Sequence, residues 1–324
     1  MIDVPVLHVP FPALMNPHAA ALGPQLQGWL LRSGLATPEL SRQFERARFD
    51  LLVASLYPTA EPDELRTMAE LVAWMFVYDD HFDVHRLGAS PAKAAAAADR
   101  VSAVLAGAPA SGPLMNALGE LVRDRLSPAP APLRQRLLGH LDDYCRSLVD
   151  ELELRASGRI PAPDVYFDLR VNTFAWPVLA DLAEFAVGTV LPAESRESRD
   201  FSALLATAGR LMILIQDLRS LDREIANGES HNVVLSLQDE RQCNLPQAIE
   251  LAHQLFADRL TEFLDRRDAV LATSDHRSRR AVAALEHLLS GHLAWYARTD
   301  RYDRADGLES LGGTDDLIFE GVDR

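Results

Sequence analysis

The sequence predicts an all-α protein, and two observations support this prediction. Apolar residues recur at helical spacing along most of the 324-residue chain, and proline or a capping residue precedes many of these stretches. No stretch alternates apolar and polar residues strongly enough to be assigned as a half-buried strand. A chain of this length can bury a large core in one domain or in two.

Proline breaks separate the elements expected in the first part of the chain. Residues 1–15 contain prolines that forbid a helix, so they should form an extended arm. Asn16-Pro17 should begin the first helix, and Thr37-Pro38 should begin the second. The break at residues 58–62 then precedes a helix that should end near Asp79.

The middle of the chain holds the candidate domain boundary. Ser90 should cap an alanine-rich helix, and residues 127–132 form a short serine, proline and alanine connector. The candidate metal-binding stretches lie on opposite sides of this connector, so we interpret residues 1–324 as one domain. Long helices are expected over 133–157 and from Pro161 to Arg170. Pro177 should then break the chain near Trp176, since proline disfavours a helical conformation at the residue before it.

Helices should also fill most of the C-terminal part. An apolar run over 211–215 turns polar as it approaches Glu224, and a turn follows it. Beside this turn lies His231, which we interpret as a loop-supporting residue rather than a catalytic one. Helices are expected over 245–268 and 277–298, and the acidic segment 303–324 should be a flexible tail.

Composition excludes several classes of function. The chain has 32 Lys and Arg against 47 Asp and Glu, a net charge of −15, and no basic stripe, so nucleic acid is not an expected partner. Two cysteines are too few for a disulfide framework and suit a reducing cytoplasm. We expect no secretory leader, because no charged stretch precedes an apolar core at the N-terminus. We also expect no membrane span, because no apolar run approaches about 20 residues. The sequence is compatible with a homodimer as well as a monomer.

Three carboxylates follow a buried-looking apolar run over 74–78. Asp79 and Asp83 are four residues apart, so on a helix they share one face, while Asp80 points elsewhere. Negative charge at a helix C-terminus is unfavourable, and a divalent cation would relieve it. Oxygen ligands without His or Cys favour Mg²⁺. The alternative for this stretch alone is a solvated helix end.

A second set of oxygens recurs after the apolar run over 211–215. Gln216, Ser220 and Glu224 follow one another at intervals of four residues, so an amide carbonyl, a hydroxyl and a carboxylate line one helix face. This all-oxygen set suits a further Mg²⁺. Arg223 adjoins the last of them and could meet a phosphate.

Together these stretches make the chain resemble a bacterial class I terpene synthase. Residues 79–83 match the family's DDxxD motif in full, and residues 216–224 match its NDxxSxxxE motif except that Gln216 replaces asparagine. Near the C-terminus, Arg301-Tyr302 matches the family's arginine–tyrosine pair. The resemblance spans nearly the whole chain and implies the class I terpenoid synthase helical bundle, with the N-terminal arm helping to cap the closed active site.

The resemblance also implies roles for individual residues. Three Mg²⁺ ions are expected, with ligands Asp79, Asp83, Gln216, Ser220 and Glu224. Arg170 lies 46 residues before Gln216, the separation of the family's diphosphate-sensing arginine. The other diphosphate-binding residues are expected to be Arg223, Arg301 and Tyr302. Asp80 is expected to pair with Arg301 rather than to bind metal.

At the expected helix break, the family uses a backbone carbonyl to steer substrate ionisation, and Phe174 stands at that position. Aromatic faces stabilise a carbocation, and the candidates for this role are Phe76, Phe82, Phe174, Trp176 and Trp295. For any one of these aromatics the alternative is plain core packing.

The resemblance thus implies a Mg²⁺-dependent lyase that ionises a linear prenyl diphosphate and cyclises the cation to a hydrocarbon or alcohol. Farnesyl diphosphate is the expected substrate, with geranyl and geranylgeranyl diphosphates as alternatives. A chain-elongating enzyme would carry a second DDxxD, so Ser220 and Glu224 argue against one. The alternative from another class is a catalytically impaired helical protein that binds prenyl diphosphates, which Gln216 suggests.

Overall fold

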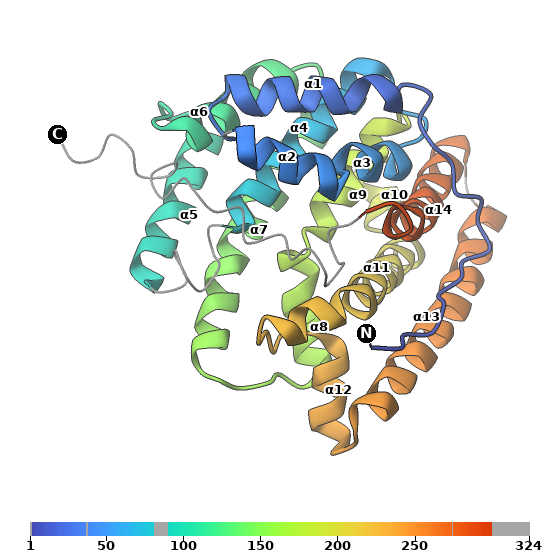
Figure 1. The fold of residues 1–324 in the computed structure, drawn as a ribbon. Coiled ribbons are helices and arrows are strands. Elements are labelled where there is room, and N and C mark those ends of the chain that lie inside the picture. Colours follow the sequence, from blue (N-terminus) through green and yellow to red (C-terminus); the bar gives the residue numbers. More distant parts are fainter. Residues whose placement is uncertain (1, 37, 81–89, 274, 300–324) are drawn as a thin grey trace.

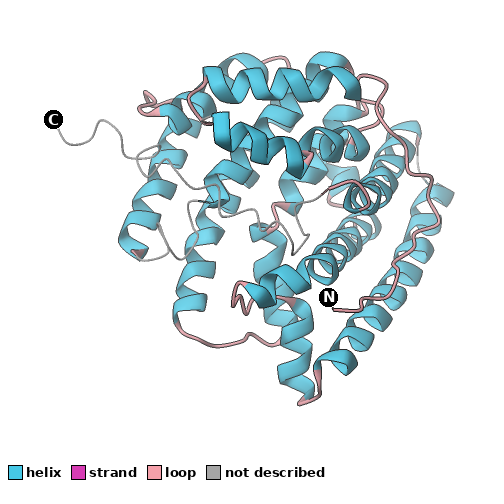
Figure 2. Cartoon of the chain, in the orientation of Figure 1, coloured by secondary structure: helices cyan, strands magenta, loops and turns pink. Residues whose placement is uncertain are grey.

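Helices are the only regular secondary structure in the residues that the computed structural model describes, which are 2–36, 38–80, 90–273 and 275–299 (Figures 1 and 2). The all-α prediction is therefore confirmed for these residues. The N-terminal helices are α1 (Ala19–Arg32), α2 (Pro38–Ala47), α3 (Phe49–Leu56), α4 (Pro62–Asp79), α5 (Pro91–Leu105) and α6 (Pro113–Glu120), followed by a π-helical turn η3 (Leu121–Arg125). The remaining helices are α7 (Ala131–Ala156), α8 (Pro163–Thr173), α9 (Trp176–Ala186), α10 (Ala193–Arg196), α11 (Arg199–Ala226), α12 (Val233–Arg241), α13 (Leu245–Thr273) and α14 (His276–Tyr296).

The residues 2–15 lie outside any helix, as expected for the N-terminal arm, and run alongside α13 (Figure 1). Leu7 and Val9 are buried, and the ring of Phe11 meets that of Phe263 edge to face at 5.9 Å. The arm is therefore anchored to α13 by apolar contacts. Its suggested part in closing an active site stays a prediction.

Helix α4 begins with a strong start signal and buries almost its whole length. Pro62 occupies the first turn, and Glu61 and Glu64 form a capping box around it. The indole of Trp74 donates a hydrogen bond to the Leu114 carbonyl of α6 at 2.8 Å. Because α4 is buried up to Tyr78, its C-terminal end brings Asp79 into the interior of the protein.

Helix α11 is the other central helix and packs against α8, α9, α12, α13 and α14. Ser198 caps it by accepting a hydrogen bond from the Phe201 amide. By length and composition α11 could cross a membrane, although the sequence led us to expect no such span. In the most apolar 18-residue stretch of α11, 67% of the residues are buried inside the protein, as in a core helix.

The chain breaks between α8 and α9 as predicted, but the break lies at residues 174–175: Trp176 already belongs to α9, and Pro177 occupies the first turn of that helix, where proline is tolerated. Helix α8 ends at Thr173, Phe174 follows it, and Ala175 takes the left-handed conformation with φ 57°. An alanine in this conformation is strained by about 1–2 kcal/mol, so the surrounding packing must hold it. The amide of Leu179 resumes helical bonding to the Ala175 carbonyl at 3.0 Å.

A buried charge cluster anchors α9 after the break. Asp181 accepts hydrogen bonds from Arg136 (2.7 Å) and Arg196 (2.9 Å) and lies 2.7 Å from the Nδ1 atom of His140. Glu184 pairs with Arg136 at 3.0 Å and also with Arg196. Since Arg136 and His140 belong to α7 and Arg196 to α10, the cluster ties three helices together.

Two details differ from the sequence-based expectations. Ser90 precedes α5, but its side chain forms no capping hydrogen bond with the described residues. The connector over 127–132 is also shorter than expected, because α7 begins at Ala131. Apolar side chains from both sides of this connector, including Leu118 and Met212, join one core cluster. A single domain stays our interpretation of this arrangement.

Candidate active site

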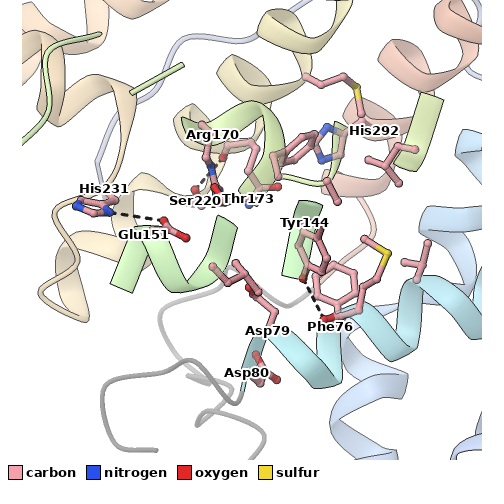
Figure 3. Close-up of a pocket in the computed structure, with 18 of the residues that line it drawn as sticks. Phe76, Asp79, Asp80, Tyr144, Glu151, Arg170, Thr173, Ser220, His231 and His292 are labelled. Atoms are coloured by element: carbon pink, nitrogen blue, oxygen red, sulfur yellow. Dashed lines mark hydrogen bonds and ion pairs between the residues drawn. The ribbon is translucent and has the colours of Figure 1, made fainter. Parts of the chain in front are cut away.

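A cavity of about 200 Å³ lies between α3, α4, α7, α8, α9, α11 and α14 (Figure 3). Its polar side chains come from the C-terminal parts of α4, α7, α8 and α11 and from the turn after α11, and we call this part of the cavity the polar end: Asp79, Asp80, Glu151, Arg155, Arg170, Gln216, Ser220, Arg223, Glu224, Glu229 and His231. The remaining lining forms the apolar end: Leu52, Leu56, Val72, Met75, Phe76, Tyr144, Leu148, Thr173, Phe174, Ala175, Leu179, Met212, His292 and Trp295. Figure 3 shows Arg170, Ser220 and Glu151 apart from Phe76 and Tyr144.

Asp79 and Asp80 reach the polar end from the C-terminus of α4. Burial, together with the charges of Asp80 and Glu151, raises the pKa of Asp79 to about 7, although Arg155 and Arg170 act in the opposite direction. The nearby arginines therefore do not fully offset the cost of holding Asp79 in its ionised form. Phe82 and Asp83 of the same motif lie outside the described residues.

Gln216, Ser220 and Glu224 all line the polar end from one face of α11, as their spacing predicts. The Ser220 hydroxyl donates a hydrogen bond to the Gln216 backbone carbonyl at 2.8 Å, and its lone pairs stay available for other groups. Burial and the charges of Asp217 and Glu229 raise the pKa of Glu224 to about 7. The described residues thus leave a second carboxylate at this end of the cavity with too little positive charge around it.

The donor set fits Mg²⁺. It consists of carboxylate, hydroxyl and amide oxygens, which hard divalent cations prefer. A cation between α4 and α11 would also stabilise the two carboxylates whose pKa values are raised, Asp79 and Glu224. Among the described residues, no three His, Cys, Asp or Glu side chains converge as a metal site.

Arg170 projects from α8 into the same end of the cavity, so the structure brings it together with the candidate metal ligands. Its Nε atom lies 3.7 Å from Asp217 Oδ1, and its guanidinium carbon lies 5.9 Å from the centre of the Phe174 ring. Burial opposes its charge, but Tyr166 and the acidic groups around it, Asp217 foremost, raise the pKa of Arg170 further. Arg170 is therefore a fixed cation facing the cavity. Arg223 lines this end as well.

Three of the predicted aromatics line the apolar end: Phe76, Phe174 and Trp295. Phe76 stacks on Phe49 at 3.9 Å, and the Trp295 indole donates to the backbone carbonyls of Ala47 (3.1 Å) and Arg48 (3.0 Å). These contacts hold the rings in place.

Trp176 does not join the cavity lining, and the prediction that it does is corrected. Its ring packs against Gly209 of α11, where an added Cβ would come within 2.6 Å of the indole. The left-handed turn at Ala175 redirects the chain, so the first side chain of α9 faces α11. The sequence pattern revealed the break but not the direction that the chain takes after it.

Side chains of α7 reach the cavity although sequence reasoning did not single them out. Tyr144, Glu151 and Arg155 all line it, and Arg155 donates to Glu151 at 3.1 Å. Burial opposes ionisation of Glu151, yet Arg155 and His231 lower its pKa to about 2. The intervals 144, 148, 151 and 155 place these positions on one helix face, so a sequence signal for them existed. His231 is buried and lies 3.6 Å from Glu151.

A second group that the sequence analysis missed supports α11 from behind. Asp217 is fully buried and accepts hydrogen bonds from the Tyr166 hydroxyl (2.6 Å) and the Val233 amide (2.9 Å). Asn232 donates to Glu224 Oε2 and to the Asp217 carbonyl, both at 2.8 Å. A carboxylate on the apolar stripe of a helix needs such partners, and this was the available signal for Asp217.

The predicted diphosphate-binding pair Arg301 and Tyr302, and with it the pairing of Asp80 with Arg301, falls outside the described residues. The tail predicted over 303–324 falls outside them too. Their assignments stay predictions.

Comparison with known proteins identifies the family. The family model described as terpene synthase family 2, C-terminal metal binding, matches residues 70–262, which include the ends of both α4 and α11. The wild-type cucumene synthase structure superimposes with a TM-score of 0.78 at 26% identity, covering 90% of this chain and all of that one. The helical arrangement is thus the class I terpene synthase fold.

Enzymes of known activity are similar over nearly the whole chain. Pristinol synthase of Streptomyces pristinaespiralis is 27% identical over 98% of this chain and 89% of its own. The (+)-T-muurolol synthase of Roseiflexus castenholzii, described as cyclising (2E,6E)-farnesyl diphosphate, is 29% identical over 90% of this chain and 92% of its own. Because the family model also spans more than half of the sequence, this chain belongs to terpene synthase family 2 and is a bacterial class I terpene synthase.

Proposed function

We propose that this terpene synthase depends on Mg²⁺ and cyclises farnesyl diphosphate to a sesquiterpene hydrocarbon or alcohol. The observation that carries the proposal is the division of one cavity into a polar end, with oxygens from α4 and α11 beside Arg170, and an apolar aromatic end. A prenyl diphosphate has the same division. The similarity to an enzyme described as cyclising (2E,6E)-farnesyl diphosphate supports the choice of chain length.

Asp79 on α4 and Gln216, Ser220 and Glu224 on α11 would hold Mg²⁺, with Asp83 as a further expected ligand. When bound, Mg²⁺ supplies positive charge to the diphosphate and so favours cleavage of its C–O bond. Three ions is our proposed number. By fixing where the positive charge lies, these side chains would place the diphosphate at the polar end, so that the prenyl chain extends toward the apolar end.

Arg170 and Arg223 would bind the remaining diphosphate oxygens. A guanidinium can contact two oxygens at once, which orients the leaving group as well as stabilising its charge. As the C–O bond breaks, negative charge grows on the diphosphate, and fixed cations at that point stabilise the transition state. We assign the same role to Arg301 and Tyr302.

The apolar end would receive the allylic carbocation. The ring faces of Phe76, Phe174 and Trp295 stabilise positive charge, and the absence of bulk water protects the cation until it cyclises. The bulky Phe174 follows α8 at the break and so limits the space beside Arg170.

Localisation and assembly complete the proposal. We place the enzyme in the cytoplasm, which agrees with its unpaired cysteines, Cys145 and Cys243. A homodimer stays a prediction, and light scattering of the purified protein measures it.

One experiment tests the function. The purified enzyme is incubated with Mg²⁺ and, separately, geranyl, farnesyl or geranylgeranyl diphosphate, and the extracts are analysed by gas chromatography with mass spectrometry. We expect a fifteen-carbon product from farnesyl diphosphate, abolished by EDTA and in Glu224→Gln. Product from another substrate alone would contradict the chain length. Pyrophosphate binding without turnover of any substrate would contradict catalysis.

A further inference from the structure

The side chain of Gln216 makes a contact that its role as a metal ligand does not by itself require. Its Oε1 atom accepts a hydrogen bond from the Tyr296 hydroxyl at 2.5 Å. The two residues are 80 positions apart in the sequence, and the bond joins the last turn of α14 to the centre of α11.

Tyr296 is held by its neighbours and can therefore fix what it touches. Its ring centre lies 5.0 Å from that of Trp295 and 5.1 Å from that of His292, and both of these residues are buried. Trp295 is in turn bonded through its indole nitrogen to the backbone between α2 and α3. A phenol in this setting donates from a defined position, whereas a flexible side chain would not.

The length of glutamine makes such a donor useful. Glutamine has one more rotatable bond than asparagine, so holding its amide oxygen in a single position costs more conformational entropy. The amide oxygen carries two lone pairs. A hydrogen bond from Tyr296 uses one of them and restricts the side chain, and a cation at the polar end would take the second.

We propose that Tyr296 is a positioning residue that sets the Gln216 amide oxygen for Mg²⁺, so that glutamine can serve where the family motif has asparagine. The inference rests on the proposed Mg²⁺-dependent function. It concerns this chain in particular, because it joins the substituted motif position to a tyrosine that no sequence motif singles out.

The test is a double-mutant cycle of Tyr296→Phe and Gln216→Asn, read as the Mg²⁺ concentration at which inorganic pyrophosphate binds in calorimetry. Tyr296→Phe keeps the ring and removes only the hydroxyl. Loss of a residue that orients a metal ligand weakens metal affinity by about 10- to 100-fold, so we expect a rise of about 10-fold in the Mg²⁺ needed. In the Gln216→Asn background the shorter amide falls short of Tyr296, and the same change should have no further effect.

Tyr57→Phe is the matched control. Tyr57 is buried, and its hydroxyl donates to the backbone carbonyl of Leu179 at 3.2 Å rather than to a candidate metal ligand. We expect its Mg²⁺ requirement to stay at the wild-type value. Thermal unfolding of each variant checks that the fold is intact.

Three results would overturn the inference. An equal loss in both backgrounds would show that Tyr296 acts on the fold rather than through Gln216. If Tyr296→Phe needs less Mg²⁺ than the wild type to bind pyrophosphate, the tyrosine competes with the metal for the oxygen. If the wild-type enzyme forms product with Mg²⁺, either of these results overturns this inference alone, whereas a wild-type enzyme that binds no pyrophosphate with Mg²⁺ overturns the proposed function as well.

Discussion

Asn232 offers a sharp test of how the α11 ligands are held. It is the N-cap of α12: its Oδ1 atom accepts a hydrogen bond from the Val234 amide at 2.8 Å. Its Nδ2 group donates to Glu224 Oε2 at 2.8 Å. Asn232→Ser keeps a capping oxygen but is too short to reach Glu224, so the two roles can be separated.

The magnitude follows from the kind of bond that is lost. A hydrogen bond to an ionised group contributes about 1.5–3 kcal/mol. If that bond orients Glu224 for Mg²⁺, its loss should weaken Mg²⁺-dependent pyrophosphate binding by about 10- to 100-fold. Asn232→Ala should show the same binding defect and a further loss of about 1 kcal/mol in unfolding free energy, because it also removes the cap.

Calorimetry with pyrophosphate and Mg²⁺, and urea unfolding of the metal-free protein, measure the two effects separately. A binding constant for Asn232→Ser within about twofold of wild type, less than 0.5 kcal/mol by the usual conversion, would refute the role of Asn232 in orienting Glu224.

Further predictions concern packing, pH and catalysis. Gly291→Ala should destabilise the protein by at least about 1–3 kcal/mol in urea unfolding, because its Cβ would lie 2.2 Å from the Ser55 carbonyl oxygen. Gly139→Ala, with nothing within 4 Å, should instead stabilise it by about 0.5–1 kcal/mol. Burial lowers the pKa of His292 to about 3, so the folded state binds fewer protons than the unfolded state below pH 6.5. Protonation of His292 should therefore lower the unfolding free energy by about 1.4 kcal/mol per pH unit as the pH drops from 6.5 toward 3. Urea unfolding at a series of pH values should show that His292→Gln lacks this contribution. Arg170→Lys should lower kcat/KM by about 100-fold in a diphosphate-release assay, because lysine cannot bind two oxygens in a fixed plane.

Local spacing explains why much of the site could be predicted. Asp79 follows a buried apolar run, which places it at the end of a core helix. Gln216, Ser220 and Glu224 recur every four residues, so helical periodicity alone places them on one face. The resemblance to a known family then related the two helices to one another and to Arg170. The structure brings all five side chains to one cavity.

Contacts between distant segments could not be predicted in this way. Tyr296 bonds to Gln216 across 80 positions, and Asn232 reaches Glu224 only because the turn after α11 folds back. Trp176 shows the same limit, because its direction depends on the φ angle of Ala175 rather than on its own spacing. Such contacts depend on tertiary packing, which a one-dimensional pattern does not contain.

The most direct measurement of the central claim is anomalous diffraction from crystals grown with Mn²⁺, a substitute for Mg²⁺, and inorganic pyrophosphate. If α4 and α11 share one metal-binding end of the cavity, Mn²⁺ peaks should lie against Asp79 and against the Gln216, Ser220 and Glu224 oxygens, with pyrophosphate between them and Arg170. Mn²⁺ and pyrophosphate bound elsewhere, with these side chains unoccupied, would contradict the account.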